Sequence, residues 1–183
     1  MALVVNRADT AMPSPDPDAL CHALAEALQA RGWMMAAAES CTGGLIAAAC
    51  TELSGSSNWF ERGFVTYSNL AKTELLGVDA ALITRAGAVS EPVARAMVLG
   101  AARRAPVQAA VAVTGVAGPT GGSAAKPVGT VWFGWRVDAM VRTEMRCFDG
   151  DRAAVRAATV VHALAGLLAL VATATPPDRP GPP

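Results

Sequence analysis

The sequence predicts an α/β protein of a single domain, a three-layer α/β/α sandwich around a mixed sheet. Segments with helical spacing of apolar residues alternate along the chain with short, continuously apolar runs that are typical of buried strands. Near the C-terminal end, residues 128–136 and 140–148 alternate apolar and polar positions across the short turn 137–139, which predicts a β-hairpin. Parallel strands joined by helices, with one antiparallel hairpin, produce a mixed sheet.

The sequence of the first half of the domain predicts three helices and two strands. Leu20, Leu24 and Leu28 share one face of a helix over 18–29, with Asp18 as its expected N-cap. Residues 33–38 form an apolar run expected to be a buried strand. A helix is expected over 42–53, a strand over 60–67 and a short helix over 69–76.

The second half predicts one helix, the hairpin and a final helix, with a strand in between. Ser90 can cap a helix expected to end at Arg104, with Pro92 in its first turn. Residues 107–113 are rich in Val and Ala and are expected to form a buried strand. The last helix is expected from Asp151 to about Val171.

Composition places limits on domain organisation and on partners. A chain of 183 residues is long enough for one domain with a sizeable core. Proline-rich composition predicts a disordered N-terminal extension over 1–17 and a disordered tail over 173–183, which leaves 18–172 as the folded domain. A formal net charge of zero does not favour nucleic acid or an anionic membrane as partner.

Other sequence features indicate a cytoplasmic protein. We see no apolar segment typical of a signal peptide, and the most apolar stretch, 160–174, is shorter than the roughly 20 residues a membrane span needs. Four cysteines lack both CxxC spacing and a disulfide-dense pattern. The sequence therefore predicts reduced cysteines, no membrane association and no metal or cofactor.

Four polar or glycine-rich loops follow predicted strands, where α/β sheets gather their ligands. They are residues 39–44 (Glu-Ser-Cys-Thr-Gly-Gly), 65–69 with Lys72 one turn later, 114–122 running to Lys126, and 148–152. A glycine-rich loop alone is often only a turn, but loops that leave backbone N–H groups free also bind anions.

Ser40 is expected where a helix begins, so its hydroxyl can be a nucleophile or simply a helix cap. The only histidines, His22 and His162, fall in the first and last predicted helices, which argues against a Ser-His-Asp triad. The base for Ser40 would then be Lys72 or Tyr67. Cys41 is the alternative nucleophile. Without a histidine partner it would need a lowered thiol pKa, and a cysteine at this position is more often a small residue packed in the core.

Lysine usage supports a role for Lys72. Of 15 basic residues only Lys72 and Lys126 are lysines, and both fall in or beside these loops. A desolvated lysine can act as a base, whereas arginine does not deprotonate near neutral pH. With only two lysines in the chain, their placement in or beside the loops can also arise by chance.

Several segments, in order, resemble the CinA C-terminal domain family over roughly residues 18–170. They are Ala-Glu-Ser-Cys-Thr-Gly-Gly-Leu-Ile-Ala-Ala (38–48), Gly-Phe-Val-Thr-Tyr-Ser-Asn (63–69) with Ala71-Lys72, Leu-Leu-Gly-Val (75–78), Gly-Ala-Val-Ser (87–90), Gly-Val-Ala-Gly-Pro (115–119), Lys-Pro-Val-Gly-Thr-Val (126–131) and Gly-Asp-Arg (150–152). Where the family commonly has Ser-Gly-Ile-Ala-Gly-Pro, this chain has Thr-Gly-Val-Ala-Gly-Pro (114–119). Thr114 therefore replaces the serine but keeps a hydroxyl.

The resemblance implies a nicotinamide-nucleotide amidase, which converts nicotinamide mononucleotide to nicotinate mononucleotide and ammonia in pyridine nucleotide salvage. It implies the form without the larger molybdopterin-binding-like domain that many members carry. Ser40 would be the nucleophile, with Lys72, Tyr67 and Thr114 as catalytic neighbours.

Amide hydrolysis also requires an oxyanion site and contacts to the nucleotide. We expect the backbone N–H groups of Thr42, Gly43 and Gly44 to hold the oxyanion, and the loop 118–122 with Arg152 to hold the phosphate. The expected substrate-binding residues are Thr42, Gly43, Gly44, Asn69, Gly118, Gly121 and Arg152. A homo-oligomer, with a dimer favoured, is the expected assembly. A non-catalytic nucleotide-binding module and, less well supported, a structural scaffold are the alternatives.

Overall fold

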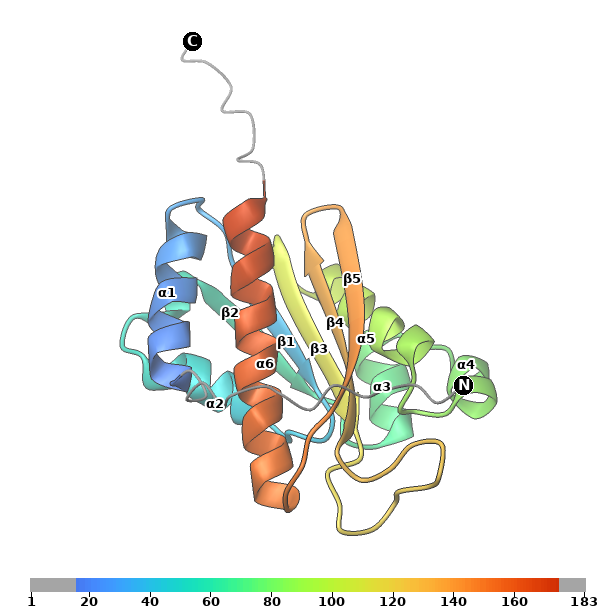
Figure 1. The fold of residues 1–183 in the computed structure, drawn as a ribbon. Helices are drawn as coiled ribbons and strands as arrows, with labels where there is room; N and C mark the ends of the chain where they lie inside the picture. Colours follow the sequence, from blue (N-terminus) through green and yellow to red (C-terminus); the bar gives the residue numbers. More distant parts are fainter. Residues whose placement is uncertain (1–15, 175–183) are drawn as a thin grey trace, which may run out of the picture.

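The computed structural model describes residues 16–174, which form a five-stranded mixed sheet covered by helices on both faces (Figure 1). The strand order is β2-β1-β3-β4-β5. β1 (Met35–Glu39) pairs in parallel with β2 (Phe60–Val65) and β3 (Ala109–Gly115), while β4 (Thr130–Val137) runs antiparallel to β3 and to β5 (Met140–Cys147). The predicted α/β/α sandwich around a mixed sheet is confirmed.

One face of the sheet carries α1 (Pro17–Gln29), α2 (Leu45–Glu52) and α6 (Arg152–Thr173), with α6 crossing the middle of the sheet (Figure 1). The larger apolar core lies here. It contains Leu24 and Leu28 from α1, Phe133 and Trp135 from β4, and Leu164 with its neighbours from α6.

The opposite face carries α3 (Asn69–Leu76), α4 (Ala80–Ala86) and α5 (Glu91–Arg104), and its core is built from smaller residues. Ala38, Ala110 and Ala112 face Val93, Met97 and Val98 of α5. At Gly134, an added Cβ would lie 2.8 Å from the carbonyl oxygen of Ala94, so the small side chains let α5 pack directly on the sheet.

Several element boundaries differ from those predicted, for local reasons. Asp16, not Asp18, caps α1, because its side chain accepts a hydrogen bond from the N–H of Asp18. α2 begins at Leu45 instead of residue 42. Ser90 precedes α5 as predicted, but its hydroxyl donates to the carbonyl of Gly87 and does not cap the helix.

The remaining predicted elements are present, with one omission. The helix over 69–76 has the predicted bounds, and the hairpin turns at Asp138 and Ala139, where Asp138 has a φ of 50°. The seven-residue helix α4 was not predicted. Within the two predicted tails, helices reach Pro17 and Thr173, which Asp16 and Ala174 flank; residues 1–15 and 175–183 of the tails lie outside the described residues.

The helix α6 is long and apolar enough to cross a membrane by length and composition. The expectation that this region is too short for a span was therefore wrong, since the helix has 22 residues. Its buried side chains belong to the main core and pack against α1, β3 and β4. A core helix of this kind meets the same criterion.

Candidate active site

The predicted catalytic loops meet at one edge of the sheet because β1, β2 and β3 are parallel and end there. Ser40 follows β1, Tyr67 follows β2, and Thr114 lies at the end of β3. β5 also ends at this edge, which brings Arg152, the first residue of α6, to the same place. Ligands of open α/β sheets bind at such carboxyl ends.

Ser40 and Lys72 are in direct contact. The Nζ atom of Lys72 lies 3.0 Å from Oγ of Ser40 and donates to the carbonyl oxygen of Thr66 at 2.8 Å. Lys72 is only 1% exposed, and burial lowers the pKa of its amine because the charged form loses hydration. The neutral amine, which can accept a proton, is thereby favoured.

The Ser40–Lys72 pair lines a cavity of about 230 Å³. Four other predicted site residues line it too: Tyr67, Asn69, Thr114 and Arg152. The hydroxyl of Thr114 donates to the carbonyl of Ala88 at 2.9 Å, so it is anchored to the loop before α5.

Tyr67 lies at the exposed rim of this cavity and, among the described residues, makes no hydrogen bond with Lys72. Its side chain is 59% exposed, and its hydroxyl accepts a hydrogen bond from Nη2 of Arg152 at 2.8 Å. In the described structure the contact with Ser40 is made by Lys72 itself, which favours direct proton transfer over a relay through Tyr67.

Arg152 lines both the catalytic cavity and a larger one of about 650 Å³. Its Nη1 donates to the carbonyl of Gly118 at 2.8 Å, and Gly118 lines the larger cavity. The backbone of Gly118 has a φ of 82°, and an added Cβ would lie 2.5 Å from Val128. Glycine is therefore required by both conformation and space. Gly121, also predicted here, is not among the residues lining either cavity.

The predicted oxyanion site needs correction. The N–H of Gly43 donates to the carbonyl of Ser40, and the N–H of Gly44 donates to the Glu39 carboxylate. These two groups are therefore not free for an oxyanion. Thr42 is fully buried and lines neither cavity, and within residues 16–174 its hydroxyl has no hydrogen-bond partner.

Ser40 does not lie at the first turn of a helix, contrary to expectation. Residues 40–44 form a turn, and α2 begins only at Leu45. The N-terminus of α2 is occupied by Glu39, a buried residue that the sequence reasoning did not select. An isolated acid at the end of an apolar run was the signal, because a buried carboxylate requires hydrogen-bond donors.

Arg156 was also not selected from the sequence. It lies one turn after Arg152 on α6, and its guanidinium donates to the carbonyl oxygens of Cys41 and Thr42. The spacing of four residues from Arg152 was a usable signal, because such residues lie on the same face of a helix.

The other candidate groups lie elsewhere or are unreactive. Cys41 lines the catalytic cavity, but burial raises the pKa of its thiol to about 11. Lys126 donates to the carbonyl of Ala86 and does not line the catalytic cavity.

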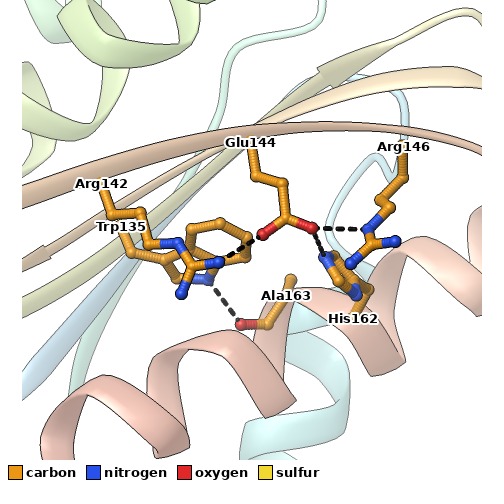
Figure 2. A network of polar contacts seen from close by, with 6 residues as sticks. All are labelled: Trp135, Arg142, Glu144, Arg146, His162 and Ala163. Carbon is orange, nitrogen blue, oxygen red and sulfur yellow. Dashed lines mark hydrogen bonds and ion pairs between the residues drawn. The ribbon is translucent and has the colours of Figure 1, made fainter.

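The histidines are outside this site, as the sequence predicted. His162 packs among Phe133, Trp135 and Phe148. Its Nε2 atom lies 3.3 Å from Oε1 of Glu144, and Figure 2 draws this contact between β5 and α6. Burial lowers the pKa of His162, and the ring belongs to the α6–sheet interface. Among residues 16–174, no three His, Cys, Asp or Glu side chains converge as a potential metal site.

Comparisons with known proteins identify the family of the chain. Residues 18–171 match the family model of the CinA C-terminal domain. The chain is 57% identical over 139 residues to a protein of Enterobacter agglomerans named nicotinamide-nucleotide amidohydrolase PncC, covering 75% of this chain and 85% of that one. It is 55% identical over 151 residues to the protein of the same name from Pseudomonas putida, covering 82% and 94%.

A solved structure shares the fold. The competence damage-inducible protein A of Klebsiella pneumoniae superposes with a TM-score of 0.85 at 39% identity, over 88% of this chain and all of that one. The match covers the whole α/β/α domain and not an isolated motif. The chain belongs to the CinA C-terminal domain family.

Proposed function

We propose that the protein is a nicotinamide-nucleotide amidohydrolase, which converts nicotinamide mononucleotide to nicotinate mononucleotide and ammonia. The observation that carries this proposal is the contact of 3.0 Å between the buried amine of Lys72 and the hydroxyl of Ser40. Relatives that bear the corresponding name are 50–57% identical to the chain over most of its length. The reaction would serve salvage of pyridine nucleotides.

In the proposed mechanism, neutral Lys72 accepts the proton of Ser40 as Oγ attacks the carboxamide carbon. The resulting tetrahedral intermediate collapses when the C–N bond breaks, and the lysine returns its proton to the departing ammonia. Water then hydrolyses the ester on Ser40, with Lys72 again as base, to release the carboxylate.

The negative oxygen of the intermediate requires N–H donors. Since Gly43 and Gly44 are engaged, we assign this role to the backbone N–H of Cys41, the residue after the nucleophile, which lines the catalytic cavity. Thr114 and Asn69 would contact the pyridine carboxamide from the other walls of the cavity.

The phosphate is proposed to lie on the Arg152 side, towards the larger cavity. That cavity is lined by Arg152 and Arg156, both from the first turns of α6, and by the backbone of Gly118. A guanidinium favours the phosphate group through charge-assisted hydrogen bonds. The carboxamide would then reach Ser40 through the smaller cavity, which shares Arg152 and Ala117 with the larger one.

A comparison of two substrates tests this proposal. Purified protein should release ammonia from nicotinamide mononucleotide at least roughly tenfold more efficiently than from nicotinamide riboside, because one lost phosphate contact costs about 1.5–3 kcal/mol. Equal efficiency would contradict the phosphate assignment. No ammonia from either compound would contradict the proposed reaction.

A non-catalytic nucleotide-binding module is the second candidate. Such a module has no need for a serine hydroxyl in contact with a buried lysine, and binding would tolerate a larger separation of the two groups. The observed Ser40–Lys72 contact therefore favours the hydrolase.

A further inference from the structure

The turn that carries Ser40 is held at its far end by a buried carboxylate. Oε2 of Glu39 accepts hydrogen bonds from the N–H groups of Gly44 at 3.1 Å and Ile46 at 3.0 Å, and Oε1 accepts from Ala47 at 2.9 Å. Glu39 is fully buried. Its side chain thus spans the turn 40–44 and fixes the start of α2 to the end of β1.

The guanidinium of Arg156, a residue of α6, holds the same turn through hydrogen bonds to its backbone carbonyls. Nε of Arg156 donates to the carbonyl of Cys41 at 3.2 Å, and Nη2 donates to that of Thr42 at 2.7 Å. Because Arg156 comes from α6, it ties the residue after Ser40 to the helix that also carries Arg152.

Glu39 is also linked to Lys72 through its backbone. The carbonyl of Glu39 accepts from the N–H of Thr66 at 2.7 Å and from its hydroxyl at 3.3 Å. The carbonyl of Thr66 in turn accepts from Nζ of Lys72 at 2.8 Å. One residue thereby connects the backbone beside the nucleophile with the group that holds the base.

We propose that Glu39 and Arg156 are positioning residues, which act through the turn 40–44 to keep Oγ of Ser40 in line with Nζ of Lys72. This inference rests on Ser40 being the nucleophile of the proposed function. Catalytic groups work only within about 0.5 Å of their productive geometry, so a turn fixed at both ends has a direct effect on rate. Neither side chain transfers a proton or needs to touch the reacting atoms.

A substrate-independent probe separates positioning from mere stability. A small alkyl fluorophosphonate reacts with an activated serine: the Oγ–P bond forms, the P–F bond breaks, fluoride leaves, and Lys72 takes the proton. Intact-mass measurement gives both the rate constant and the final labelled fraction. Protein that is misfolded and cannot refold lowers the final fraction, whereas a displaced but folded Ser40 lowers the rate constant at full labelling. The urea unfolding midpoint of each variant shows that reversible unfolding does not account for a lower rate constant.

Two conservative variants and two matched controls complete the test. In Glu39→Gln the amide NH2 faces a backbone N–H that needs an acceptor, and in Arg156→Lys one ammonium replaces a guanidinium that serves two carbonyls. Asp79→Asn makes the same acid-to-amide change at the cap of α4. Arg31→Lys makes the same basic change where a guanidinium donates to the carbonyls of Ala172 and Ala174 at the C-terminal end of α6 and to that of Ala27 in α1.

We expect Glu39→Gln and Arg156→Lys to lower the labelling rate constant at least about tenfold, with labelling still reaching completion. Both controls should label at the wild-type rate. Wild-type rate constants in Glu39→Gln and Arg156→Lys, or losses confined to the labelled fraction, would overturn the inference.

Labelling and ammonia release by the wild type distinguish failure of the proposed function from failure of the positioning role. If the wild type labels at Ser40 but releases no ammonia from nicotinamide mononucleotide, the substrate is wrong, and the variants still test positioning. If the wild type does not label at Ser40, both the proposed nucleophile and this inference are contradicted.

Discussion

Lys72 is a buried basic side chain whose hydrogen bonds are both to neutral oxygens, those of Ser40 and Thr66. Among the described residues no acid forms an ion pair with it. A protonated lysine in such a place is costly, whereas a neutral one is tolerated. The same burial that disfavours the charge therefore prepares the amine to act as a base.

Arginine should not replace Lys72. Lys72→Arg keeps the charge but cannot accept a proton, so we expect ammonia release to fall about 10²- to 10⁴-fold, as far as in Lys72→Ala. Lys126→Arg, at the only other lysine, should retain activity because Lys126 lies outside the catalytic cavity. If Lys72→Arg kept most of the wild-type rate, Lys72 would be an electrostatic anchor and not the base.

The lowered pKa of Lys72 also has a consequence for stability. Between this lowered pKa and the ordinary value of about 10.4, the unfolded chain binds a proton that the folded protein does not. The free energy of unfolding of the wild type should therefore rise with pH relative to Lys72→Met, by at most about 1.4 kcal/mol per pH unit.

Urea unfolding of the two proteins at several pH values measures this difference. The gain should begin near the lowered pKa of Lys72 and end above the ordinary lysine value. A difference that is constant from neutral pH to pH ~11 would show that the pKa of Lys72 is not lowered by folding.

At the scale of elements, α3 is held in place by close contact with α5. An added Cβ at Gly100 of α5 would lie 2.2 Å from the carbonyl oxygen of Leu76, the last residue of α3. The contact is between backbones, so side-chain rearrangement cannot relieve it. It fixes the helix that carries Lys72.

Gly100→Ala should therefore destabilise the protein, although alanine favours helix by about 1 kcal/mol over glycine. Overpacking of this kind typically costs about 1–3 kcal/mol, measured as the loss in free energy of unfolding. Arg103→Ala, at an exposed position of the same helix, should have little effect. An unchanged or raised stability for Gly100→Ala would show that α3 and α5 separate easily.

Elements whose start and end are both marked by residues next to them in the sequence could be predicted. α3 has a serine cap before it and a glycine in the left-handed conformation after it, and its bounds were correct. The start of α2 was wrong because the turn 40–44 is held by Glu39 and by Arg156, which lies over a hundred residues away. α4 was missed because a helix of seven residues with a single buried side chain, Ile83, has little periodicity.

For the molecule as a whole, the site follows from the parallel order of β2, β1 and β3. That order places Ser40, Tyr67 and Thr114 at one edge, and the positions of their loops after predicted strands indicated that these three residues lie near one another. Which hydrogen bonds they make could not be predicted. The pairing of Tyr67 with Arg152 and the engagement of the Gly43 and Gly44 N–H groups depend on the distances between elements.

Arg152 lines both cavities, and its removal should weaken recognition of the phosphate more than it slows the chemical step. Arg152→Ala should reduce the preference for nicotinamide mononucleotide over its riboside at least about tenfold, mainly through KM. Steady-state ammonia assays on both compounds measure it, with Arg95→Ala on α5 as a control outside both cavities. A preference that survives in Arg152→Ala would move the phosphate to another site.

In the proposed mechanism Ser40, and not the neighbouring Cys41, carries the covalent step. The direct measurement is ammonia release from nicotinamide mononucleotide by the wild type, Ser40→Ala and Cys41→Ser, each checked for folding by its unfolding midpoint. We predict that Ser40→Ala loses turnover, because no hydroxyl remains beside Lys72, while Cys41→Ser keeps most of it, since a thiol with a pKa of about 11 is a poor nucleophile at neutral pH. Turnover that persists in a folded Ser40→Ala variant would contradict the account.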